Sequence, residues 1–377
     1  MAHHKEQSNV GEKMRWMLLL RIVLGIGMSS ESPNDWPMFM HDPEHTGTAS
    51  CAAPDTAFIL WEYDTGVPVA ASPVVVGDKV FLAAHGEMIA LQIDTGSVIW
   101  SKEVPVMGST PAVSGDTIVV GTLSGFAALN SETGELLWER LIWEPYCYPY
   151  GEYFISSPVI VGNRVYVGTG TNQMPVMPTA EDERLRQPLK YVICMDIESG
   201  EKLWRTYVNG YAFSSPAFSD NVLYMSAATC YAINPDDGEL YWTHNFDYPL
   251  GGSPVIVDDS IIIAVRSHYE DSKVLRIEKT TILWSRDFEG DVSSATPVSQ
   301  GKVVVITIKG DLYVLDFETG DILWSKNLGG EYLIKLGFIN THPCSPSIAD
   351  GKIYVGTVNG LFSCLDLETG ETMWQYQ

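Results

Sequence analysis

Two histidines near the N-terminus have the spacing of a metal site. His41 and His45 form a His-x-x-x-His pattern, which on a helix would place both imidazoles on one face and suit zinc. Pro43 lies between them and argues against a helix, because proline lacks a backbone donor and clashes with the preceding turn. We therefore expect residues 31–57 to form an extended lead-in that packs on the rest of the fold.

Other short motifs of catalytic sites are incomplete. Gly168-Thr169-Gly170 follows an expected strand but lacks the third glycine and the helix of a phosphate-binding turn. The sequence contains no Gly-x-Ser-x-Gly nucleophile elbow. The acidic runs 181–183 and 258–259 are typical of solvated loops rather than of metal ligands. The residues therefore predict no catalytic, cofactor or metal site, and we expect a protein that is not an enzyme.

The charge balance argues against nucleic acid as a partner. Lysine and arginine number 23 against 47 aspartates and glutamates, a formal net charge of -24. A surface this acidic repels phosphate backbones, and no basic run offsets it.

Residues 1–30 have the order of an export signal. Lys13 and Arg15 precede the apolar run 17–28, which Arg21 interrupts, and small residues follow. The run is shorter than the roughly 20 apolar residues of a membrane helix, so the membrane is reached at most through this leader. We expect an exported protein, extracellular or periplasmic. The alternative is a disordered leader on a cytoplasmic protein. A lipid anchor needs a cysteine just after the run, and the nearest is Cys51.

The six cysteines form no Cys-x-x-Cys pair. Cys194 and Cys364 stand where related segments carry alanine, as at Ala128, which favours small buried side chains. Cys344 could pair with Cys51 or with Cys147 in an oxidising compartment, and the sequence leaves this connectivity open.

One segment recurs seven times along the chain. Ser-Pro or Thr-Pro pairs place prolines at 73, 111, 158, 216, 254, 297 and 346, and each is followed by a tryptophan, at 100, 138, 204, 242, 284, 324 and 374. The third repeat carries an insertion, residues 171–190. A period of about 40 residues with several short strands is typical of a β-propeller blade.

Each repeat contains four expected strands. Short apolar strands follow the proline, and an acidic-Thr-Gly turn such as Glu132-Thr133-Gly134 precedes the last strand, which ends on the tryptophan. Glycine supplies the left-handed residue of this turn. The fifth repeat lacks the glycine and runs through 278–281 instead.

The fold prediction is an all-β propeller of four-stranded antiparallel blades over residues 58–377. Radial stacking buries both faces of each sheet and leaves few exposed edges. Seven blades are expected, with eight as the alternative. Residues 58–64 repeat the last-strand pattern with Trp61, and we expect them to close the ring as a strand of the last blade.

These motifs make the chain resemble the pyrroloquinoline-quinone-like propeller repeat family, whose tryptophan-docking motif is acidic-Thr-Gly followed by x-Leu-Trp. The opening 35–39 is similar to the start of exported members. The resemblance implies that one tryptophan per repeat packs between neighbouring blades: Trp61, Trp100, Trp138, Trp204, Trp242, Trp284, Trp324 and Trp374.

The same family includes quinone-dependent alcohol dehydrogenases. A resemblance to these enzymes would imply two features: an adjacent Cys-Cys pair beside the quinone, and acidic and amide ligands for calcium. This sequence has no adjacent cysteines. We expect no cofactor, with pyrroloquinoline quinone and calcium as the alternative.

Binding residues are expected where the repeat is broken. One deviation lies between the second and third repeats, the other is the insertion 171–190, and both are expected near one blade. Arg276 replaces the small residue of the fifth repeat, as a polar spot or a paired arginine. The candidate partner-binding residues are Trp143, Tyr146, Tyr148, Tyr150, Tyr153, Arg266, His268 and Arg276.

The sequence therefore predicts a non-catalytic, monomeric platform for a protein or carbohydrate partner at its loop face or axial mouth. A family relative with such a role is the propeller lipoprotein of outer-membrane protein assembly. The alternative is a quinone- or metal-dependent oxidoreductase.

Overall fold

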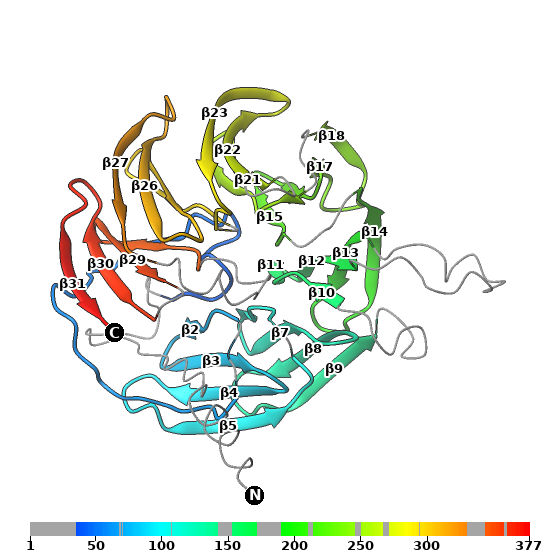
Figure 1. Cartoon of the computed structure of the whole chain (residues 1–377). Helices are drawn as coiled ribbons and strands as arrows, with labels where there is room; N and C mark the ends of the chain where they lie inside the picture. The colour runs from blue at the N-terminus through cyan, green and yellow to red at the C-terminus, as the bar shows by residue number, and fades with distance from the viewer. Residues whose placement is uncertain are drawn as a thin grey trace, which may run out of the picture.

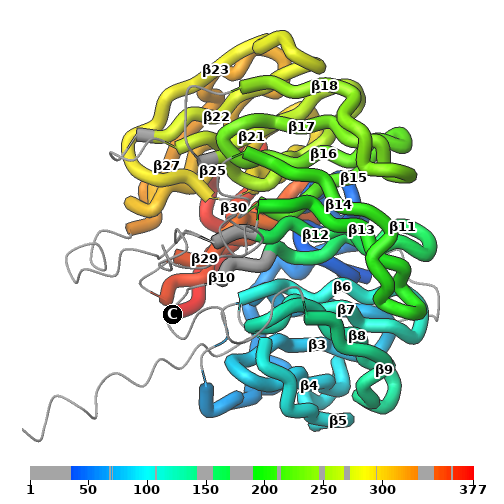
Figure 2. Tube along the Cα trace, turned by 90° about the vertical axis from the view of Figure 1, so that its right-hand side faces the viewer, coloured from blue at the N-terminus to red at the C-terminus, as the bar shows by residue number. Residues whose placement is uncertain are grey.

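The propeller prediction is confirmed. The computed structural model describes residues 35–67, 69, 71–106, 108–141, 153–171, 190–209, 214–245, 250–266, 271–293, 295–329, 344–357 and 360–377. All regular structure in these ranges is β-strand, and it forms seven antiparallel sheets that follow one another around a ring (Figure 1). Figure 2 shows the outer strands of neighbouring sheets along the side of the ring. We number the sheets as blades 1 to 7 in chain order.

Four blades have four strands each, the first strand nearest the axis. Blade 1 contains β2 (Val74–Val76), β3 (Lys79–Ala84), β4 (Glu87–Gln92) and β5 (Val98–Glu103). Blade 2 contains β6 (Ala112–Ser114), β7 (Thr117–Gly121), β8 (Gly125–Asn130) and β9 (Leu136–Leu141). Blade 4 contains β15 (Ala217–Ser219), β16 (Val222–Ser226), β17 (Thr229–Ile233) and β18 (Leu240–Asn245). Blade 6 contains β24 (Val298–Ser299), β25 (Lys302–Ile306), β26 (Asp311–Asp316) and β27 (Ile322–Asn327).

Three blades carry a fifth strand. Blade 3 contains β10 (Tyr153–Ile155), β11 (Val159–Val161), β12 (Arg164–Thr171), β13 (Tyr191–Asp196) and β14 (Lys202–Tyr207). Blade 5 contains β19 (Leu250–Gly251), β20 (Val255–Val257), β21 (Ser260–Arg266), β22 (Asp271–Glu278) and β23 (Thr281–Glu289). Blade 7 contains β28 (Ser347–Ala349), β29 (Lys352–Gly356), β30 (Phe362–Asp366) and β31 (Thr372–Tyr376), with β1 (Thr48–Ala49) beside β28.

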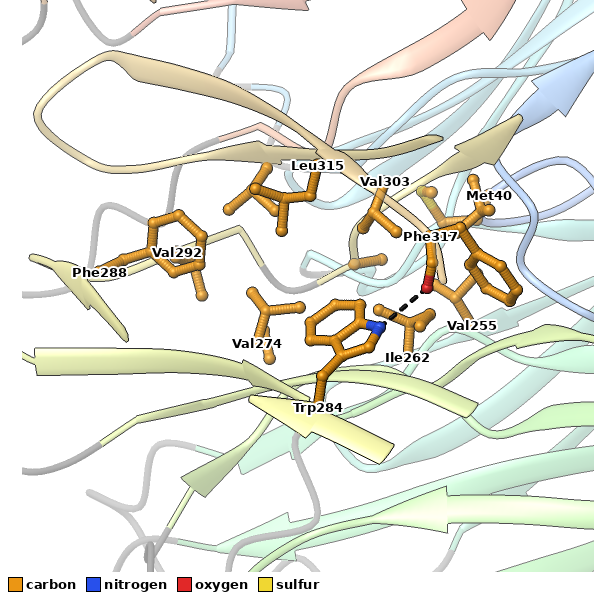
Figure 3. Close-up of a cluster of buried hydrophobic side chains, with 14 residues drawn as sticks. Met40, Val255, Ile262, Val274, Trp284, Phe288, Val292, Val303, Leu315 and Phe317 are labelled. Carbon is orange, nitrogen blue, oxygen red and sulfur yellow. Dashed lines mark hydrogen bonds between the residues drawn. The ribbon is translucent and has the colours of Figure 1, made fainter. Parts of the chain in front are cut away.

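Apolar side chains between blades form the core. The middle strands are buried on both faces because each face packs on a neighbouring blade, as for β3 and β8. Figure 3 shows the cluster between blades 5 and 6, where Val274 and Trp284 face Val303 and Leu315. Burial of apolar area on this scale is the main stabilising term of such a fold.

Seven of the eight tryptophans dock on a neighbouring element. Each indole Nε1 donates a hydrogen bond to a backbone carbonyl of the following element, over 2.6 to 3.3 Å. In Figure 3 the dashed line is the bond from Trp284 to Phe317 O, 2.8 Å. Trp242 is the exception, since its indole makes no such bond within the described residues; like Trp324, it is only partly buried.

The turn glycines leave the space that these indole rings occupy. A Cβ at Gly134, whose φ is +69, would lie 2.6 Å from the Trp100 ring, and Gly200 has the same relation to Trp138. Blade 5 has Lys279 at a φ of 54 in its corresponding turn, and this blade receives Trp242. The missing glycine and the missing indole bond therefore occur at one seam, between blades 4 and 5.

The serine or threonine before the proline links blades 1 to 5 in succession around the axis. The Thr110 N–H donates to Ser157 Oγ over 3.1 Å, the Ser157 N–H to Ser215 Oγ over 3.1 Å, and the Ser215 N–H to Ser253 Oγ over 2.9 Å. A hydroxyl accepts in place of a strand partner here, because the inner strand is interrupted at the Ser-Pro pair. The recurring Ser-Pro pair is thus a contact between blades.

The expected closure by strand 58–64 is wrong. Residues 58–62 form no strand, and β31 remains the outer strand of blade 7. The N-terminal strand that joins blade 7 is β1, which pairs in parallel with the inner strand β28. A last-strand sequence forms a ladder only where a third strand lies beside it, and residues 58–62 have none among the described strands.

The lead-in, residues 35–49, contains turns at residues 38–44 and crosses the inner strands of successive blades. Its carbonyls accept hydrogen bonds from β2, β6, β15, β20, β24 and β28, over 2.7 to 3.1 Å. His45 is fully buried within it, and its Nδ1 lies 3.0 Å from Pro254 O while Nε2 has no partner. The segment therefore ties six of the seven blades together, and His45 is part of that contact.

We expect Gly134→Ala to destabilise the protein more than Gly162→Ala. Both glycines have positive φ, but nothing lies within 4 Å of a Cβ at Gly162. The strained φ costs each variant about 1 kcal/mol, and overlap with Trp100 adds about 1–3 kcal/mol only at Gly134. Equilibrium urea unfolding measures both. Equal losses would contradict the docking explanation for the glycine.

We expect the free energy of unfolding to depend on His45 at acidic pH. Burial lowers the pKa of its imidazole to about 4 from 6.5, so the unfolded chain binds the proton first as pH falls. The contribution of His45 to the free energy of unfolding is therefore fully present above pH 6.5. It falls by about 3 kcal/mol as the pH is lowered towards 4. His45→Asn, which retains a donor for Pro254 O, should flatten the pH dependence relative to the exposed control His85→Asn in urea titrations. Parallel pH profiles would refute it.

Candidate partner-binding surface

The two segments that break the repeat meet at blade 3. The extra strand β10 pairs with β12, and Tyr153 at the start of β10 is opposite Thr171 at the end of β12. The first deviation therefore ends where the insertion 171–190 begins, as expected. Trp143, Tyr146, Tyr148 and Tyr150 lie outside the described residues, and so does the side chain of Tyr153.

An aromatic and cationic cluster lies on the outer strands of this blade. Tyr191 in β13 pairs with Tyr207 in β14, and their ring centroids are 6.1 Å apart. The Arg205 guanidinium lies 4.7 Å from the centroid of Tyr191, a cation–π distance. Tyr207 is 52% exposed and Arg205 is exposed as well. We call Tyr191, Arg205 and Tyr207 the tyrosine–arginine patch.

Sequence reasoning missed this patch. The signal was available in the repeat, because the residue after the docking tryptophan is Ser101 in blade 1 and Arg205 in blade 3, and two residues later Glu103 is replaced by Tyr207. Tyrosine and arginine are enriched in protein interfaces.

Arg266 lies at the end of β21, opposite Leu250 of the extra strand β19. Its guanidinium forms an ion pair with Asp291 over 3.4 Å. His268 is outside the described residues. The structure therefore places Arg266 at the rim of blade 5, away from the tyrosine–arginine patch of blade 3.

Arg276 joins two blades. Its Nη1 donates to Glu318 Oε2 over 2.6 Å and to Phe317 O over 3.0 Å, and its guanidinium carbon lies 4.0 Å from the Phe317 ring centroid. Its Nε donates to Ser260 Oγ over 2.9 Å. All these partners except Ser260 belong to blade 6, so Arg276 has the role of a paired arginine in the seam.

Other seams place a cation where blade 5 has Ser260. The first residue of the second strand is Lys79, Arg164, Lys302 or Lys352, and each pairs with the acidic residue of the following turn over 2.5 to 3.0 Å. In blade 5 that position is Ser260, and Arg276 supplies the charge from the neighbouring strand. Arg276 therefore replaces, in blade 5, the structural role of the lysine or arginine at the start of the second strand in those blades.

The cysteines that the structure describes are unpaired. A disulfide between Cys51 and Cys344 is excluded, because Cys51 follows Ala49, which pairs with Ala349, whereas Cys344 precedes the other end of β28. That separation is about 15–20 Å at 3.3 Å per residue, beyond disulfide reach. Cys194, Cys230 and Cys364 are fully buried, and burial raises the pKa of the Cys194 and Cys230 thiols to about 12. Cys147 lies outside the described residues.

Within the described ranges, His, Cys, Asp and Glu side chains form no group of three placed to hold a metal ion. His41 pairs with Asp42 over 3.1 Å, and His45 is directed at Pro254 O, so the His-x-x-x-His pair does not converge. The same ranges contain no helix long and apolar enough to cross a membrane.

A family model described as outer membrane protein assembly factor BamB matches residues 43–190, 189–281 and 270–377. The chain belongs to this family. The matched ranges cover every blade of the propeller, so membership rests on the whole repeat array.

The chain spans less than half the length of the curated relatives it matches. It is 28% identical over 168 residues to BamB of Yersinia pestis, covering 39% of this chain and 42% of the relative. It is 23% identical over 224 residues to a tetrathionate hydrolase of Acidithiobacillus ferrooxidans, covering 50% of this chain and 43% of that protein.

Solved structures share the fold. BamB from Moraxella catarrhalis has a TM-score of 0.61 at 16% identity, covering 81% of this chain and 85% of that structure. A europium-containing methanol dehydrogenase has a TM-score of 0.70 at 13% identity, covering 92% and 86%. These identities establish the propeller fold and carry no assignment of activity.

We expect Arg276→Ala to reduce stability without affecting partner binding. The variant removes the bridge to Glu318 and Phe317 at the blade seam, and a partly buried pair of this kind contributes about 1–2 kcal/mol. Lys273→Ala is the control, because Lys273 lies in the same strand but pairs within its own blade with the exposed Asp287, which contributes about 0–1 kcal/mol. Urea unfolding measures both. Weakened partner binding at unchanged stability would return Arg276 to the candidate site.

Proposed function

We propose that this protein is a non-catalytic binding platform in the assembly of outer-membrane proteins, acting outside the cytoplasm on a protein partner. Membership in the BamB family supports this role. The observation that carries it is the tyrosine–arginine patch, in which the exposed Arg205 and Tyr207 of strand β14 lie beside Tyr191 of β13, in the one blade that both repeat-breaking segments border.

The patch has the physical properties of a contact surface. Tyrosine offers large apolar area with a polar end and loses little side-chain entropy on binding, and arginine donates several hydrogen bonds. The two residues project from outer strand β14, which is held by β13 and by docking of Trp204 onto Pro235 O over 2.9 Å. A rigid scaffold beneath flexible side chains lowers the entropic cost of association.

A protein partner is favoured over a carbohydrate because of the strand edge beside the patch and the family relationship. The net charge of -24 adds long-range attraction for a basic surface. The proposal includes no quinone and no metal, since the platform needs neither.

The experiment is complementation in a bacterium that lacks its own BamB. The full chain should restore the amount of folded outer-membrane β-barrel proteins, and the double variant Arg205→Ala/Tyr207→Ala should lose most of this effect, because hot-spot truncations each cost about 1–2 kcal/mol of binding. The matched control Ser101→Ala/Glu103→Ala changes the same two positions of blade 1 and should restore fully. Protein levels by immunoblotting confirm equal expression.

Full restoration by the Arg205/Tyr207 variant would remove the patch from the proposal. Failure of the unaltered chain, expressed and exported at normal levels, would contradict the assembly role itself.

A further inference from the structure

Residues 53–61 occupy the place of half a blade between blades 7 and 1. Pro54 O accepts the indole hydrogen bond of Trp374 over 3.3 Å, as Ser131 O does for Trp100 over 3.0 Å. Asp55 pairs with Lys352 over 2.9 Å, as Glu132 pairs with Lys79 over 3.0 Å. In Figure 1 the blue trace of this segment runs outside the ring from β31 to β5.

The half-blade consists of a turn and an outer segment. Trp61 docks on Ile93 O of blade 1 over 2.6 Å, as an outer-strand tryptophan does. Phe58, Ile59 and Leu60 are 42–44% exposed, in the range of the outer-strand residues Val98 and Ile99. The backbone of residues 57–61 pairs with no strand of the described chain, so its edge toward the axis is available for a ladder.

The face of blade 7 next to this segment carries two aromatic residues that are only partly buried. Phe362 is only partly buried, whereas Met88 and Leu312, at the same position in blades 1 and 6, are fully buried. Tyr354 is likewise partly buried, whereas its equivalent Phe81 is buried. Phe362, Tyr354 and Trp374 contact one another, with ring centroids 5.8 to 6.5 Å apart. We call these three residues the blade 7 aromatic face.

The Tyr354 hydroxyl indicates what is missing there. It is buried and has no nitrogen or oxygen partner among the described residues, and it interacts with the thiol of Cys364, a weak hydrogen-bonding group. At the closed seam between blades 3 and 4, the equivalent Tyr166 hydroxyl donates to Pro235 O over 3.3 Å. A buried hydroxyl without a partner is unfavourable, so a backbone carbonyl brought to this face would stabilise it.

The opposite side of the position is closed. Val80, Leu82 and Leu91 on blade 1 are buried and pack with Trp61 and Val69 in a cluster that contains no residue of blade 7. Because the chain covers blade 1 in this way, the opening lies against blade 7 and beside residues 57–61. This is the place of one third strand.

We propose that the position between residues 57–61 and the blade 7 aromatic face accepts one extended strand of a partner polypeptide. The strand would pair with residues 57–61 and pack on Phe362 and Tyr354, a form of β-strand addition. This inference is independent of the tyrosine–arginine patch, since it uses the opposite part of the ring.

The third strands of this protein define the chemistry of the occupant. The residue opposite each docking tryptophan is small in most blades, as for Ala90 with Trp100 and Ala128 with Trp138. The alternate residues are large and apolar, as Ile89 and Leu91 are. An acceptable strand therefore has about five or six residues with alanine opposite Trp61, and basic flanks suit the net charge of -24.

The test uses the full-length protein and a fluorescent peptide with the β8 sequence 125–130 between pairs of lysines. We expect saturable binding by fluorescence anisotropy, weakened about tenfold or more by Phe362→Lys in the protein and by tryptophan in place of the alanine of the peptide that corresponds to Ala128. The control Leu323→Lys, an exposed apolar residue of blade 6, should bind as the unaltered protein does. Circular dichroism confirms that both variants fold, and the altered peptide tests the site without any change to the protein.

Three results would overturn the proposal. The first is absence of saturable binding, or equal binding of both peptides. In the second, binding occurs only when the apolar residues 17–24 are replaced by serines in the full-length chain, which would assign the position to the chain's own leader. In the third, the protein is a dimer that the peptide dissociates, which would assign it to a second copy.

Discussion

Docking of one indole on the next blade is the interaction on which this ring depends. A tryptophan at the end of an outer strand must both fill the space between two sheets and satisfy its N–H, and the following turn answers both needs with a carbonyl and a glycine. The Trp100 ring would lie 2.6 Å from any Cβ at Gly134, and its N–H reaches Ser131 O. Tryptophan, carbonyl and glycine therefore form one unit, which explains why they recur together along the chain.

Where this unit is altered, its parts change together. In the seam between blades 4 and 5 the glycine is replaced by Lys279, and Trp242 makes no indole hydrogen bond to any residue that the structure describes. In the seam between blades 5 and 6, Ser260 occupies the second-strand position where four other blades carry a lysine or arginine. Arg276 supplies the positive charge from the adjacent strand. A closed ring tolerates such exchanges because each blade is held from two sides and by the lead-in that crosses six inner strands.

Much of the fold follows from local patterns. The repeat period, the turns and the docking tryptophans could be predicted because each depends on residues close in sequence and recurs seven times. The closure could not. Residues 58–64 have the pattern of an outer strand, but a strand also requires a partner, and only the three-dimensional arrangement shows that β1 makes the closing ladder with β28. The tryptophan-docking pattern likewise located Trp61 correctly, since docking needs the next blade rather than a ladder.

The candidate surfaces lie outside local patterns for the same physical reason. Arg205 and Tyr207 are ordinary surface residues in the sequence, and they become a cluster because β14 pairs with β13 and brings Tyr191 beneath the guanidinium. Regular blades bury both faces of their sheets against adjacent blades, so they offer little surface to another molecule. Both surfaces that we propose for contacts with other molecules therefore lie where regularity fails, at blade 3 with its added strand β10 and at the half-blade beside the blade 7 aromatic face. The seam between blades 4 and 5 is irregular too, since Lys279 replaces the turn glycine, but the strands that flank it, β17, β18, β22 and β23, are all paired within their own sheets. Irregularity alone therefore does not free a strand for a partner.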